Sequence, residues 1–417
     1  MAVKCVISGP VDIYAGYGQR ALDFIKTLIE IKPDWDIKIL SQRWGNCRSG
    51  YLADHNEVDI INRIIPKLTE QPDVWIQITV PNEFQAIGKV NIGVTAAMET
   101  TVCDPSWIHG CNRMNFIITS SEHGKRSLTN SKYINNETKQ PLELKVPVLV
   151  LFEGVDKKRY RYGQNYKKLF GEGEISDWNY LCIGHWMQGD LGEDRKNIGY
   201  TVKAFLETFL DQKDAPGLVL KTCRATSSVM DRYEILKRLY TIREWVQTEN
   251  PGKSLPEVYL LHGDLSDEDM NALYNDNRIK AMVSLTKGEG FGRPLLEFAA
   301  IGKPVMCSGW SGQLDFLDRK HTACVGGQLT RVHPSAAVKN IILQEAAWFT
   351  PDDTTVKTAF REVYKNYDKW KELAYQQART IRKDFSLDAM SKKLKEILDN
   401  YMPELTNIEC DFIIPEE

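Results

Sequence analysis

The sequence predicts an α/β protein built from two doubly wound domains, each a parallel sheet covered by helices on both faces. Three observations lead to this prediction. The chain has 417 residues, which suits two domains of roughly 200 residues each. Short apolar runs alternate with helical patterns along most of the length. The runs are mainly apolar, which is typical of parallel strands that are buried on both faces.

In the first half, strand-like runs and helical patterns follow one another along the chain. The predicted strands are Lys4–Ser8, Asp36–Leu40, Val74–Val80, Ile92–Thr95, Asn115–Ser120 and Val146–Leu151. Apolar residues at helical spacing predict helices over Gln19–Glu30 and Val58–Leu68.

The second half shows the same alternation. The predicted strands are Tyr180–Ile183, Leu218–Thr222, Val258–Leu261, Ala281–Leu285 and Pro304–Cys307. The predicted helices are Tyr200–Leu210, Ser228–Glu249, Asp267–Tyr274 and Pro294–Ala300, and a long helical pattern over Asp353–Met402 ends the fold.

The polar stretch Asp156–Asp177, rich in Lys, Tyr and Gly, predicts the domain boundary. We expect the last helix to pack back on the N-terminal domain. The expected parts are an N-terminal domain over 1–170, a C-terminal domain over 178–382, the last helix over 383–402 and an acidic tail over 403–417.

Composition narrows the class of protein. The net charge is −3, but residues 1–170 carry 22 basic and 18 acidic residues, a local excess of +4 that suits a negatively charged partner. The nine cysteines are scattered and odd in number, which favours a reducing compartment. The chain starts with a strand-like run, without an apolar signal region or a span of about 20 apolar residues. We expect a cytoplasmic protein that does not bind membranes.

The most informative segment is VSLTKGEGFGRPLLEFAAIGKPVMCSGWSGQLDFL, residues 283–317. A strand runs into Gly288-Glu289-Gly290-Phe291-Gly292, and a helix is predicted from Pro294. Glycines let a backbone approach an anion closely, and a helix N-terminus offers free N–H groups. The loop lies at the carboxyl end of a strand, where open α/β sheets bind ligands. It therefore predicts a cradle for a phosphate or for sugar hydroxyls.

Glu289 and Glu297 flank this cradle, and a carboxylate is a natural acceptor for two sugar hydroxyls. For Glu297 a second interpretation stays open. An acid in the first helical turn is stabilised by the helix dipole by at most about 1 kcal/mol, with no role in binding.

Glu289-Gly-Phe-Gly-Arg-Pro-Leu-Leu-Glu297, followed by Gly-Lys-Pro-Val, resembles the Glu-x7-Glu signature of the large retaining glycosyltransferase family with the GT-B fold. The segments HGDLSDEDMNALY, GHWMQGDLGEDRKNIGYTVKAF and KDFSLDAM resemble other parts of that family's C-terminal domain. The resemblance covers about residues 180–400. Over residues 1–175, the fold pattern and a glycine loop, Gly16-Tyr-Gly18, agree with it.

The resemblance implies a nucleotide diphosphate sugar, most simply a UDP-sugar, as co-substrate and no other cofactor. It implies that Glu297 binds the ribose and that Glu289 contacts the donor sugar as a catalytic residue. The resemblance also implies that Lys196 binds the diphosphate. The implied backbone contacts come from Gly290, Phe291 and Gly292, from the segment beginning at His262, which borders the base, and from Gly16 and Gly18 beneath the phosphates.

The sequence departs from the family pattern at two places. His185 stands where the family usually has Arg, and either Arg195 or Lys287 is expected to supply the missing charge. The family's N-terminal histidine near the donor sugar is also absent. Glu99 or Thr100 occupies that neighbourhood, and Glu99 is the second candidate catalytic residue.

The N-terminal half also resembles glycosyltransferases of T-even-like bacteriophages, some of which add glucose or arabinose to 5-hydroxymethylcytosine in DNA. The resemblance lies in ISGPVDIYAGYGQRALDF, SQRWGNCRSG, DVWIQITVPNEF and ETTVCDPSWIHGCNRMN. It implies modified DNA as acceptor and, for a phage protein, the host cytoplasm. Loop residues that combine base stacking with phosphate contacts are the candidate acceptor site. They are Arg43, Trp44, Arg48, Trp107, Arg113 and Lys125.

Other functions remain as alternatives. They are a transferase for a small-molecule or lipid acceptor, a nucleotide-sugar epimerase, and a non-catalytic module that binds sugar nucleotides or DNA. Asp34-Trp-Asp36 is formally a metal-binding Asp-x-Asp, but we interpret it as a solvated turn. The spacings of Cys103, His109 and Cys111 are unlike those of zinc sites. We therefore expect no metal, and the sequence leaves the oligomeric state open.

Overall fold

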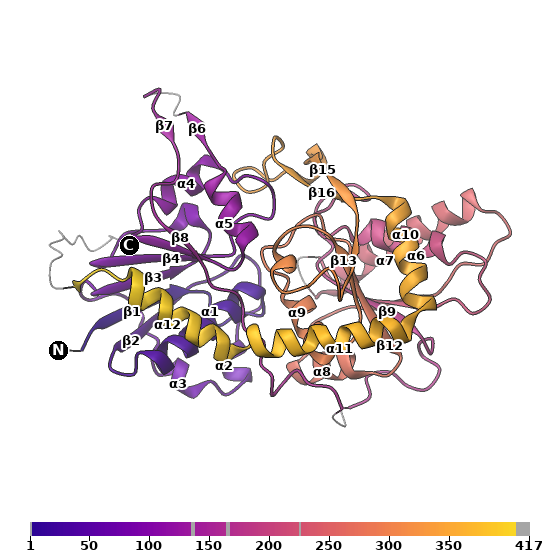
Figure 1. Cartoon of the computed structure of the whole chain (residues 1–417), viewed down its shortest axis with the longest axis horizontal. Helices are drawn as coiled ribbons and strands as arrows, with labels where there is room; N and C mark the ends of the chain where they lie inside the picture. Colours follow the sequence, from indigo (N-terminus) through magenta and orange to yellow (C-terminus); the bar gives the residue numbers. More distant parts are fainter. Residues whose placement is uncertain (1, 135–137, 164–166, 225–226, 406–417) are drawn as a thin grey trace. The chain divides into compact units, whose positions relative to one another are not determined.

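The computed structural model describes residues 2–134, 138–163, 167–224 and 227–405. The chain divides into two compact units. The first comprises Met1–Gly154 with Phe385–Glu417, and the second comprises Val155–Asp384 (Figure 1). The division falls before the predicted boundary at residue 170, because Arg159 forms an ion pair with Asp267 of the second unit at 2.7 Å.

The first unit contains a six-stranded parallel sheet in the order β2-β1-β3-β4-β5-β8. Its strands are β1 (Lys4–Gly9), β2 (Asp36–Ser41), β3 (Val74–Ile78), β4 (Val90–Thr95), β5 (Phe116–Thr119) and β8 (Val148–Val150). Its helices are α1 (Gly16–Ile31), α2 (Tyr51–Asp54), α3 (Val58–Ile61), α4 (Pro105–Cys111), α5 (Glu122–Thr129) and α12 (Leu387–Tyr401).

Helix α12 completes the core of the first unit. Apolar residues one helical turn apart give it a buried face, which includes Met390, Leu394 and Leu398. These side chains belong to the same buried cluster as Phe24 and Leu28 of α1, and the two helices lie against each other. The C-terminal helix therefore shields apolar surface that the N-terminal sequence alone would leave exposed.

The second unit contains another six-stranded parallel sheet, in the order β11-β10-β9-β12-β13-β14. Its strands are β9 (Asn179–Ile183), β10 (Gly217–Lys221), β11 (Val258–Leu261), β12 (Ile279–Ser284), β13 (Val305–Ser308) and β14 (Ala323–Val325). Its helices are α6 (Ile198–Thr208), α7 (Val229–Glu249), α8 (Asp267–Asn275), α9 (Arg293–Ile301), α10 (Asp353–Lys365) and α11 (Tyr367–Asp384). Two parallel sheets with helices confirm the predicted α/β class.

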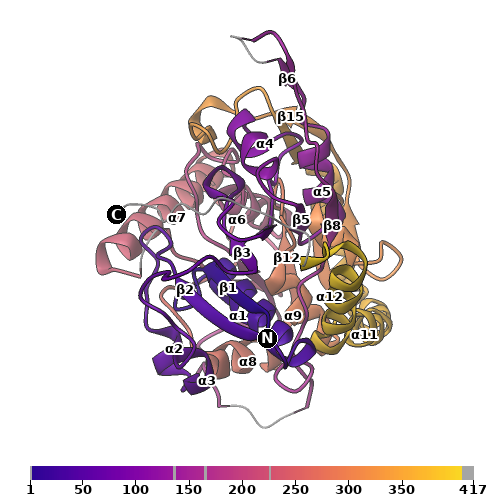
Figure 2. The same cartoon turned by 90° about the vertical axis from the view of Figure 1, so that its left-hand side faces the viewer.

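Two antiparallel hairpins are additions that the sequence did not predict. The hairpin of β6 (Tyr133–Ile134) and β7 (Pro141–Leu142) projects from the rest of the first unit in both views (Figures 1 and 2). The hairpin of β15 (Gly327–Arg331) and β16 (Ala347–Pro351) belongs to the second unit.

The predicted helix over Val58–Leu68 is wrong beyond Ile61. The N–H of Ile39 donates to the carbonyl of Arg63, and the N–H of Ile65 donates to the carbonyl of Ile39, so this segment pairs with β2. Pro66 also disfavours a continuing helix, because a residue before proline avoids the helical region. The predicted helical tail over Asp353–Met402 is divided in the same way into α10, α11 and α12.

Among the described residues, no helix is both long and apolar enough to cross a bilayer.

Gly16 and Gly18, two residues apart at the start of α1, differ in their surroundings. A Cβ at Gly18 would lie 2.5 Å from the carbonyl oxygen of Ile13, whereas a Cβ at Gly16 would meet nothing within 4 Å. We predict that Gly18→Ala lowers the free energy of unfolding by about 1–3 kcal/mol. Gly16→Ala should change it by at most about 1 kcal/mol. Urea unfolding of both variants checks this, and equal stabilities would contradict it.

Candidate active site

The candidate donor residues of the second unit lie where the strand order of its sheet reverses. From β9 the chain proceeds through β10 and β11 to one edge, and from β12 through β13 and β14 to the other. Open α/β sheets bind ligands at such a point, beside the carboxyl ends of the two central strands. Lys196 follows β9 and Glu289 follows β12. The topology therefore brings residues that are far apart in the sequence to the same edge.

Glu289 is a buried carboxylate held by two cations. The Nζ of Lys196 lies 2.6 Å from its Oε1, and the Nη1 of Arg195 lies 3.7 Å from its Oε2. Burial by itself disfavours the ionised form, but Lys196 and Arg195 outweigh it and hold the pKa of Glu289 below its ordinary value. Glu289 is therefore a fixed, ionised hydrogen-bond acceptor.

The loop that carries Glu289 is fixed by the loop after β13. The N–H of Glu289 donates to the Oγ of Ser311 at 2.9 Å, and the N–H of Gly312 donates to the Glu289 carbonyl at 3.0 Å. A Cβ at Gly312 would lie 2.2 Å from the carbonyl oxygen of Gly290, so only glycine allows this approach. Ser311 has a φ of 78°, which a non-glycine residue adopts at a cost of about 1 kcal/mol or more. The surrounding hydrogen bonds therefore determine this backbone path.

Helix α9 begins directly after this loop without a side-chain cap. Its N-cap, Gly292, has a φ of 99°. Among the helices of at least eight residues whose caps are described, α1, α6 and α9 lack a side-chain hydrogen bond from the N-cap, whereas α5, α7, α8, α10 and α12 have one. The starts of α1, α6 and α9 are therefore the ones suited to accept an external anion.

Glu297 lies on α9 and has partners of its own. Its Oε1 accepts from the Nε of Arg293 at 3.0 Å, and its Oε2 accepts from the hydroxyl of Tyr274 at 3.2 Å. The Tyr160 hydroxyl is a third partner, and burial still raises the pKa of Glu297 above its ordinary value. A carboxylate accepts at about four positions, which leaves room for a ligand hydroxyl.

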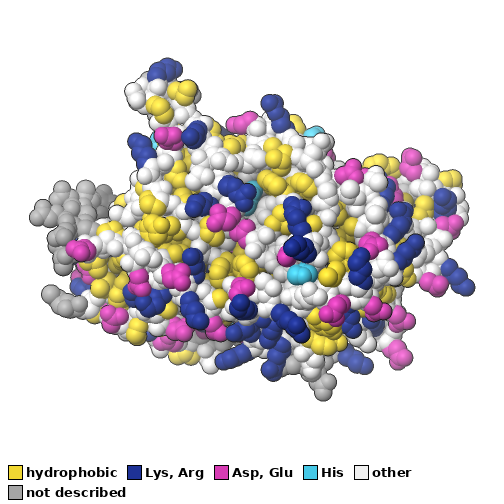
Figure 3. All heavy atoms as spheres, viewed as in Figure 1, with side chains coloured by type: hydrophobic (Ala, Val, Ile, Leu, Met, Phe, Trp, Pro, Cys, Tyr) yellow, Lys and Arg dark blue, Asp and Glu magenta, His cyan; other side chains and the backbone are white. Residues whose placement is uncertain are grey.

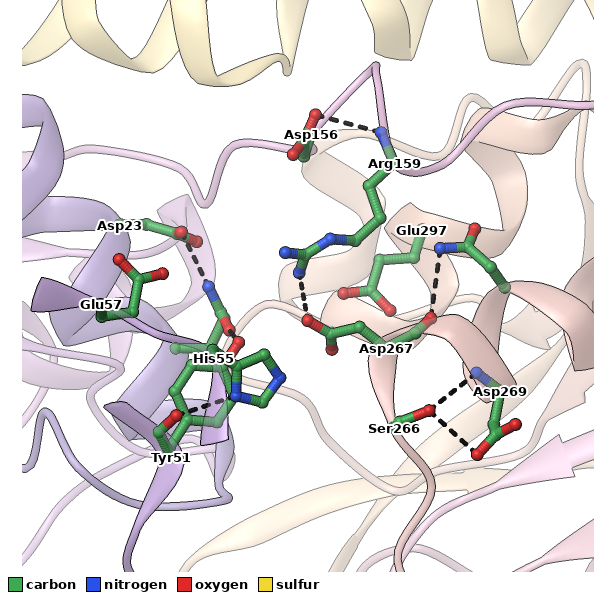
Figure 4. A network of polar contacts seen from close by, with 12 residues as sticks. Asp23, Tyr51, His55, Glu57, Asp156, Arg159, Ser266, Asp267, Asp269 and Glu297 are labelled. Carbon is green, nitrogen blue, oxygen red and sulfur yellow. Dashed lines mark hydrogen bonds and ion pairs between the residues drawn. The ribbon is translucent and has the colours of Figure 1, made fainter. Parts of the chain in front are cut away.

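The interpretation of Glu297 as an acid of the first helical turn is wrong. Helix α9 begins at Arg293, so Glu297 is its fifth residue, and the first turn holds no acid. Figure 4 shows Glu297 close to the ion pair of Arg159 and Asp267, near the start of α8. Arg159 and Tyr160 were not predicted to lie near Glu297, because they come from the segment before β9. Tyr274, however, ends the quoted HGDLSDEDMNALY segment.

The side chains of the remaining candidates in the second unit mainly contact other protein groups. The Nε2 of His262 lies 3.1 Å from the Oδ2 of Asp231, in a buried pair. His185 interacts through its Nδ1 with the carbonyl of Arg224 at 2.8 Å, and burial lowers the pKa of His185. The ring of Phe291 packs on Phe316, so a ligand contact from this residue is left to its backbone.

In the first unit, Tyr17 and Trp44 form a stacked pair beside the glycine loop. Their ring centroids are 4.2 Å apart. The Tyr17 hydroxyl lies 3.1 Å from the Oγ1 of Thr95 and accepts from the N–H of Ala96, so the pair is attached to the end of β4. Trp44 is half-buried and Arg43 is exposed. The stack therefore presents an aromatic face next to a cation.

Arg48 and Glu99 also lie in loops of the first unit. Arg48 forms an ion pair with Asp54 at 2.8 Å and lies over the ring of Tyr14 at 4.5 Å. Glu99 is half-buried. The backbone of Glu99 hydrogen-bonds to His123, and burial lowers the pKa of that imidazole to about 4.

Two candidates for the acceptor-binding site, Trp107 and Arg113, interact with the rest of the first unit instead. Trp107 is 2% exposed and lies in the core on α4, not in a loop. The guanidinium of Arg113 donates to the carbonyls of Phe84 and Asn82 at 2.6 and 3.0 Å. Trp107 looked like a loop residue because the short helix α4 carries little periodic signal, whereas Arg113 does lie in a turn after α4.

No family model matches the chain, and no curated protein matches it in sequence. Solved structures do match its fold over nearly the whole length. One is HepE of Anabaena in complex with UDP and glucose, at 12% identity and a TM-score of 0.60, covering 95% of this chain and 100% of HepE. Another is a glycosyltransferase of Rickettsia africae, at 13% identity and a TM-score of 0.60, covering 96% and 99%.

The sucrose-phosphate synthase of Thermosynechococcus elongatus is also similar, at 12% identity and a TM-score of 0.58, covering 95% of this chain and 98% of that one. At such low identities the likeness establishes the fold. The chain has the GT-B architecture of two doubly wound α/β domains that these glycosyltransferases share.

Glu289 and Glu297 should respond oppositely to pH. A lowered pKa in the folded state means that ionised Glu289 stabilises the fold above the ordinary glutamate range, and that this stability is lost as the pH falls through the folded pKa. A raised pKa means that ionised Glu297 is less stable in the fold, so its contribution falls as the pH rises through the folded pKa.

We therefore predict that Glu289→Gln lowers the free energy of unfolding more at pH 7 than at low pH. We predict that Glu297→Gln lowers it less at pH 7 than at low pH. Urea unfolding of both variants and the wild type over a pH series measures this. Parallel pH profiles for the two variants would show that the two carboxylates have the same electrostatic environment.

Proposed function

We propose that the chain is a retaining glycosyltransferase that takes a sugar from a UDP-sugar. The observation that carries this proposal is the buried Glu289, held by Lys196 and Arg195 at the switch point of the second sheet, beside the uncapped start of α9. A fixed carboxylate next to cations and the uncapped start of a helix suits a ligand with both hydroxyls and a diphosphate. The similarity to HepE, whose structure contains UDP and glucose, agrees with this ligand.

Each donor residue then has a chemical role. Glu297 accepts from the ribose hydroxyls, and Glu289 accepts from the transferred sugar, with Glu99 of the first unit as the second candidate at that sugar. Lys196 and Arg195 bind the diphosphate. The backbone of Gly290, Phe291 and Gly292 adds N–H donors, as do Gly16 and Gly18 at the start of α1. The backbone at His262 borders the base.

The same groups account for the reaction. When the glycosidic bond to the diphosphate breaks, positive charge develops on the sugar and negative charge on the leaving group. Lys196, Arg195 and the start of α9 stabilise the leaving diphosphate, which makes a divalent metal unnecessary in this proposal. The acceptor hydroxyl attacks from the face that the diphosphate leaves, which gives retention without a protein nucleophile.

For the acceptor we propose 5-hydroxymethylcytosine in phage DNA. The likeness of the N-terminal half to phage enzymes and its excess of positive charge support this. The Trp44–Tyr17 stack with Arg43 is suited to an extruded base and its phosphates. On the face shown in Figure 3 basic side chains are mixed with acidic ones, so we expect phosphate contacts from individual arginines rather than from a continuous basic surface.

We predict that Lys196→Ala weakens UDP binding by about ten- to hundredfold, because it removes a charged hydrogen bond to phosphate. Binding of uridine, which lacks phosphate, should change little. Calorimetric titration of both ligands measures the difference. Lys203→Ala in α6, the helix that follows Lys196, is the matched control, because Lys203 pairs with Glu207 instead. Equal losses for UDP and uridine would show that Lys196 serves only the fold through Glu289.

We predict sugar transfer to duplex DNA containing 5-hydroxymethylcytosine but not to the same duplex with cytosine, using UDP-glucose or UDP-arabinose as donor. Because phosphate contacts release counterions, activity should fall steeply with salt. Arg43→Ala with Arg48→Ala should flatten that slope. Mass spectrometry of the digested DNA measures transfer. Donor hydrolysis without any modified DNA would disprove the DNA acceptor and leave the transferase proposal standing.

A further inference from the structure

A cavity of about 620 Å³ lies in the second unit under the β15–β16 hairpin, and we refer to it as the hairpin pocket. One wall consists of hairpin residues such as Thr330, Arg331 and Thr350. The other consists of Glu193 and Lys287, which belong to the loops that carry Lys196 and Glu289. The pocket therefore adjoins the proposed donor site, and of the donor candidates named above it is lined by Lys287, the alternative to Arg195.

The pocket is built on a buried cation. Lys287 is 2% exposed. Its Nζ donates to the Oγ1 of Thr350 at 3.2 Å and lies 3.7 Å from the Oε2 of Glu193. The Oγ1 of Thr330 lies 2.6 Å from that of Thr350, which extends the polar chain across the hairpin. An ammonium group has three donors, so Lys287 retains hydrogen-bonding capacity toward the cavity.

Hydrogen bonds on two sides hold the pocket in shape. The N–H of Phe349 in β16 donates to the carbonyl of Lys287 at 2.9 Å. On the opposite side, the Oγ of Ser335 accepts from the N–H of Asp190 at 2.9 Å, and its carbonyl accepts from the Nε2 of Gln188 at 3.1 Å. The hairpin is thus fastened to both loops, and the cavity is a preformed feature of the second unit.

The charges of the lining identify the ligand class. The cations Lys287 and Arg331 are balanced by the carboxylates Glu193 and Glu345. A phosphate would meet the two carboxylates, and an apolar ligand would cover the polar lining groups without offering them hydrogen bonds. The lining residues Thr330 and Gln344 can both donate and accept. A neutral ligand rich in hydroxyls matches this mixture, since each hydroxyl both donates and accepts.

We infer that the hairpin pocket binds a carbohydrate, at a site separate from the nucleotide-sugar site. The volume lies within the usual range for small-molecule sites, about 300–1,000 Å³. Because the pocket shares its loops with Lys196 and Glu289, sugar binding and UDP binding should alter each other's affinity by the same factor. The inference concerns binding by the second unit and does not rest on the proposed transfer reaction.

The test is saturation-transfer NMR of the full chain with D-glucose, D-galactose, L-arabinose and N-acetyl-D-glucosamine as probes, each with excess UDP to occupy the donor site. We expect at least one sugar to bind in the presence of UDP. The double variant Thr330→Val with Gln344→Leu should weaken that binding about tenfold, because it removes two hydrogen-bonding groups. Gln328→Leu, on the same hairpin but outside the pocket, is the matched control and should bind normally.

If the double variant does not fold, Arg331→Ala with Glu345→Ala removes two exposed lining groups and serves the same purpose. Binding of none of the sugars would overturn the inference, and so would binding that neither double variant weakens. Sugar binding that both tests assign to the pocket, in a chain that shows no glycosyl transfer, would support the inference while contradicting the proposed function.

Discussion

The arrangement of the second unit's functional edge depends on one interaction, the buried carboxylate of Glu289 held by Lys196 and Arg195. A buried charge is tolerated only when it is paired, and removing one partner of such a pair costs about 3–5 kcal/mol. The ion pair joins the loop after β9 to the loop after β12. The backbone of Glu289 joins both to the loop after β13 through Ser311 and Gly312. Three loops from three neighbouring strands are therefore held in one arrangement.

This constraint explains why α9 can start without a side-chain cap. The glycines before it bring the chain into the helix without a capping side chain, and a cap there would compete with a ligand. Glu297 extends the site along the helix, and Arg293, Tyr274 and Tyr160 hold its carboxylate in place. One glutamate has its pKa lowered by cations and the other has it raised by burial. Two residues of the same type, eight positions apart, thus have different electrostatic environments.

The sequence was most informative where local pattern and tertiary structure agree. Central parallel strands such as β3 and β12 are apolar along their length, so their positions followed from composition alone. The glycines before α9 and the carboxylates beside them predicted where a ligand site lies, because turn chemistry and helix-terminus chemistry are local. The pairing of Lys196 with Glu289 was not predictable in this way, since it follows from the reversal of strand order between β9 and β12.

The predictions that were wrong concern segments where tertiary contacts override the local sequence pattern. The segment after Ile61 has helical spacing but pairs with β2 instead, so a long-range hydrogen bond overrides the local pattern. Trp107 looks like a loop residue in the sequence, yet α4 packs its indole into the core. Arg113 does lie in an exposed turn, but two backbone carbonyls accept from its guanidinium. The β15–β16 hairpin was not predicted, because β15 is polar and largely exposed, although β16 is apolar and mostly buried.

We propose that the loop around Glu289 and the start of α9 form a nucleotide diphosphate site, and a crystal structure of the chain with UDP would test this. We expect the diphosphate at the start of α9, within hydrogen-bonding distance of Lys196. We expect the ribose hydroxyls on the carboxylate of Glu297. A bound UDP whose phosphates lie elsewhere, with the Lys196–Glu289 pair and Glu297 untouched, would contradict it.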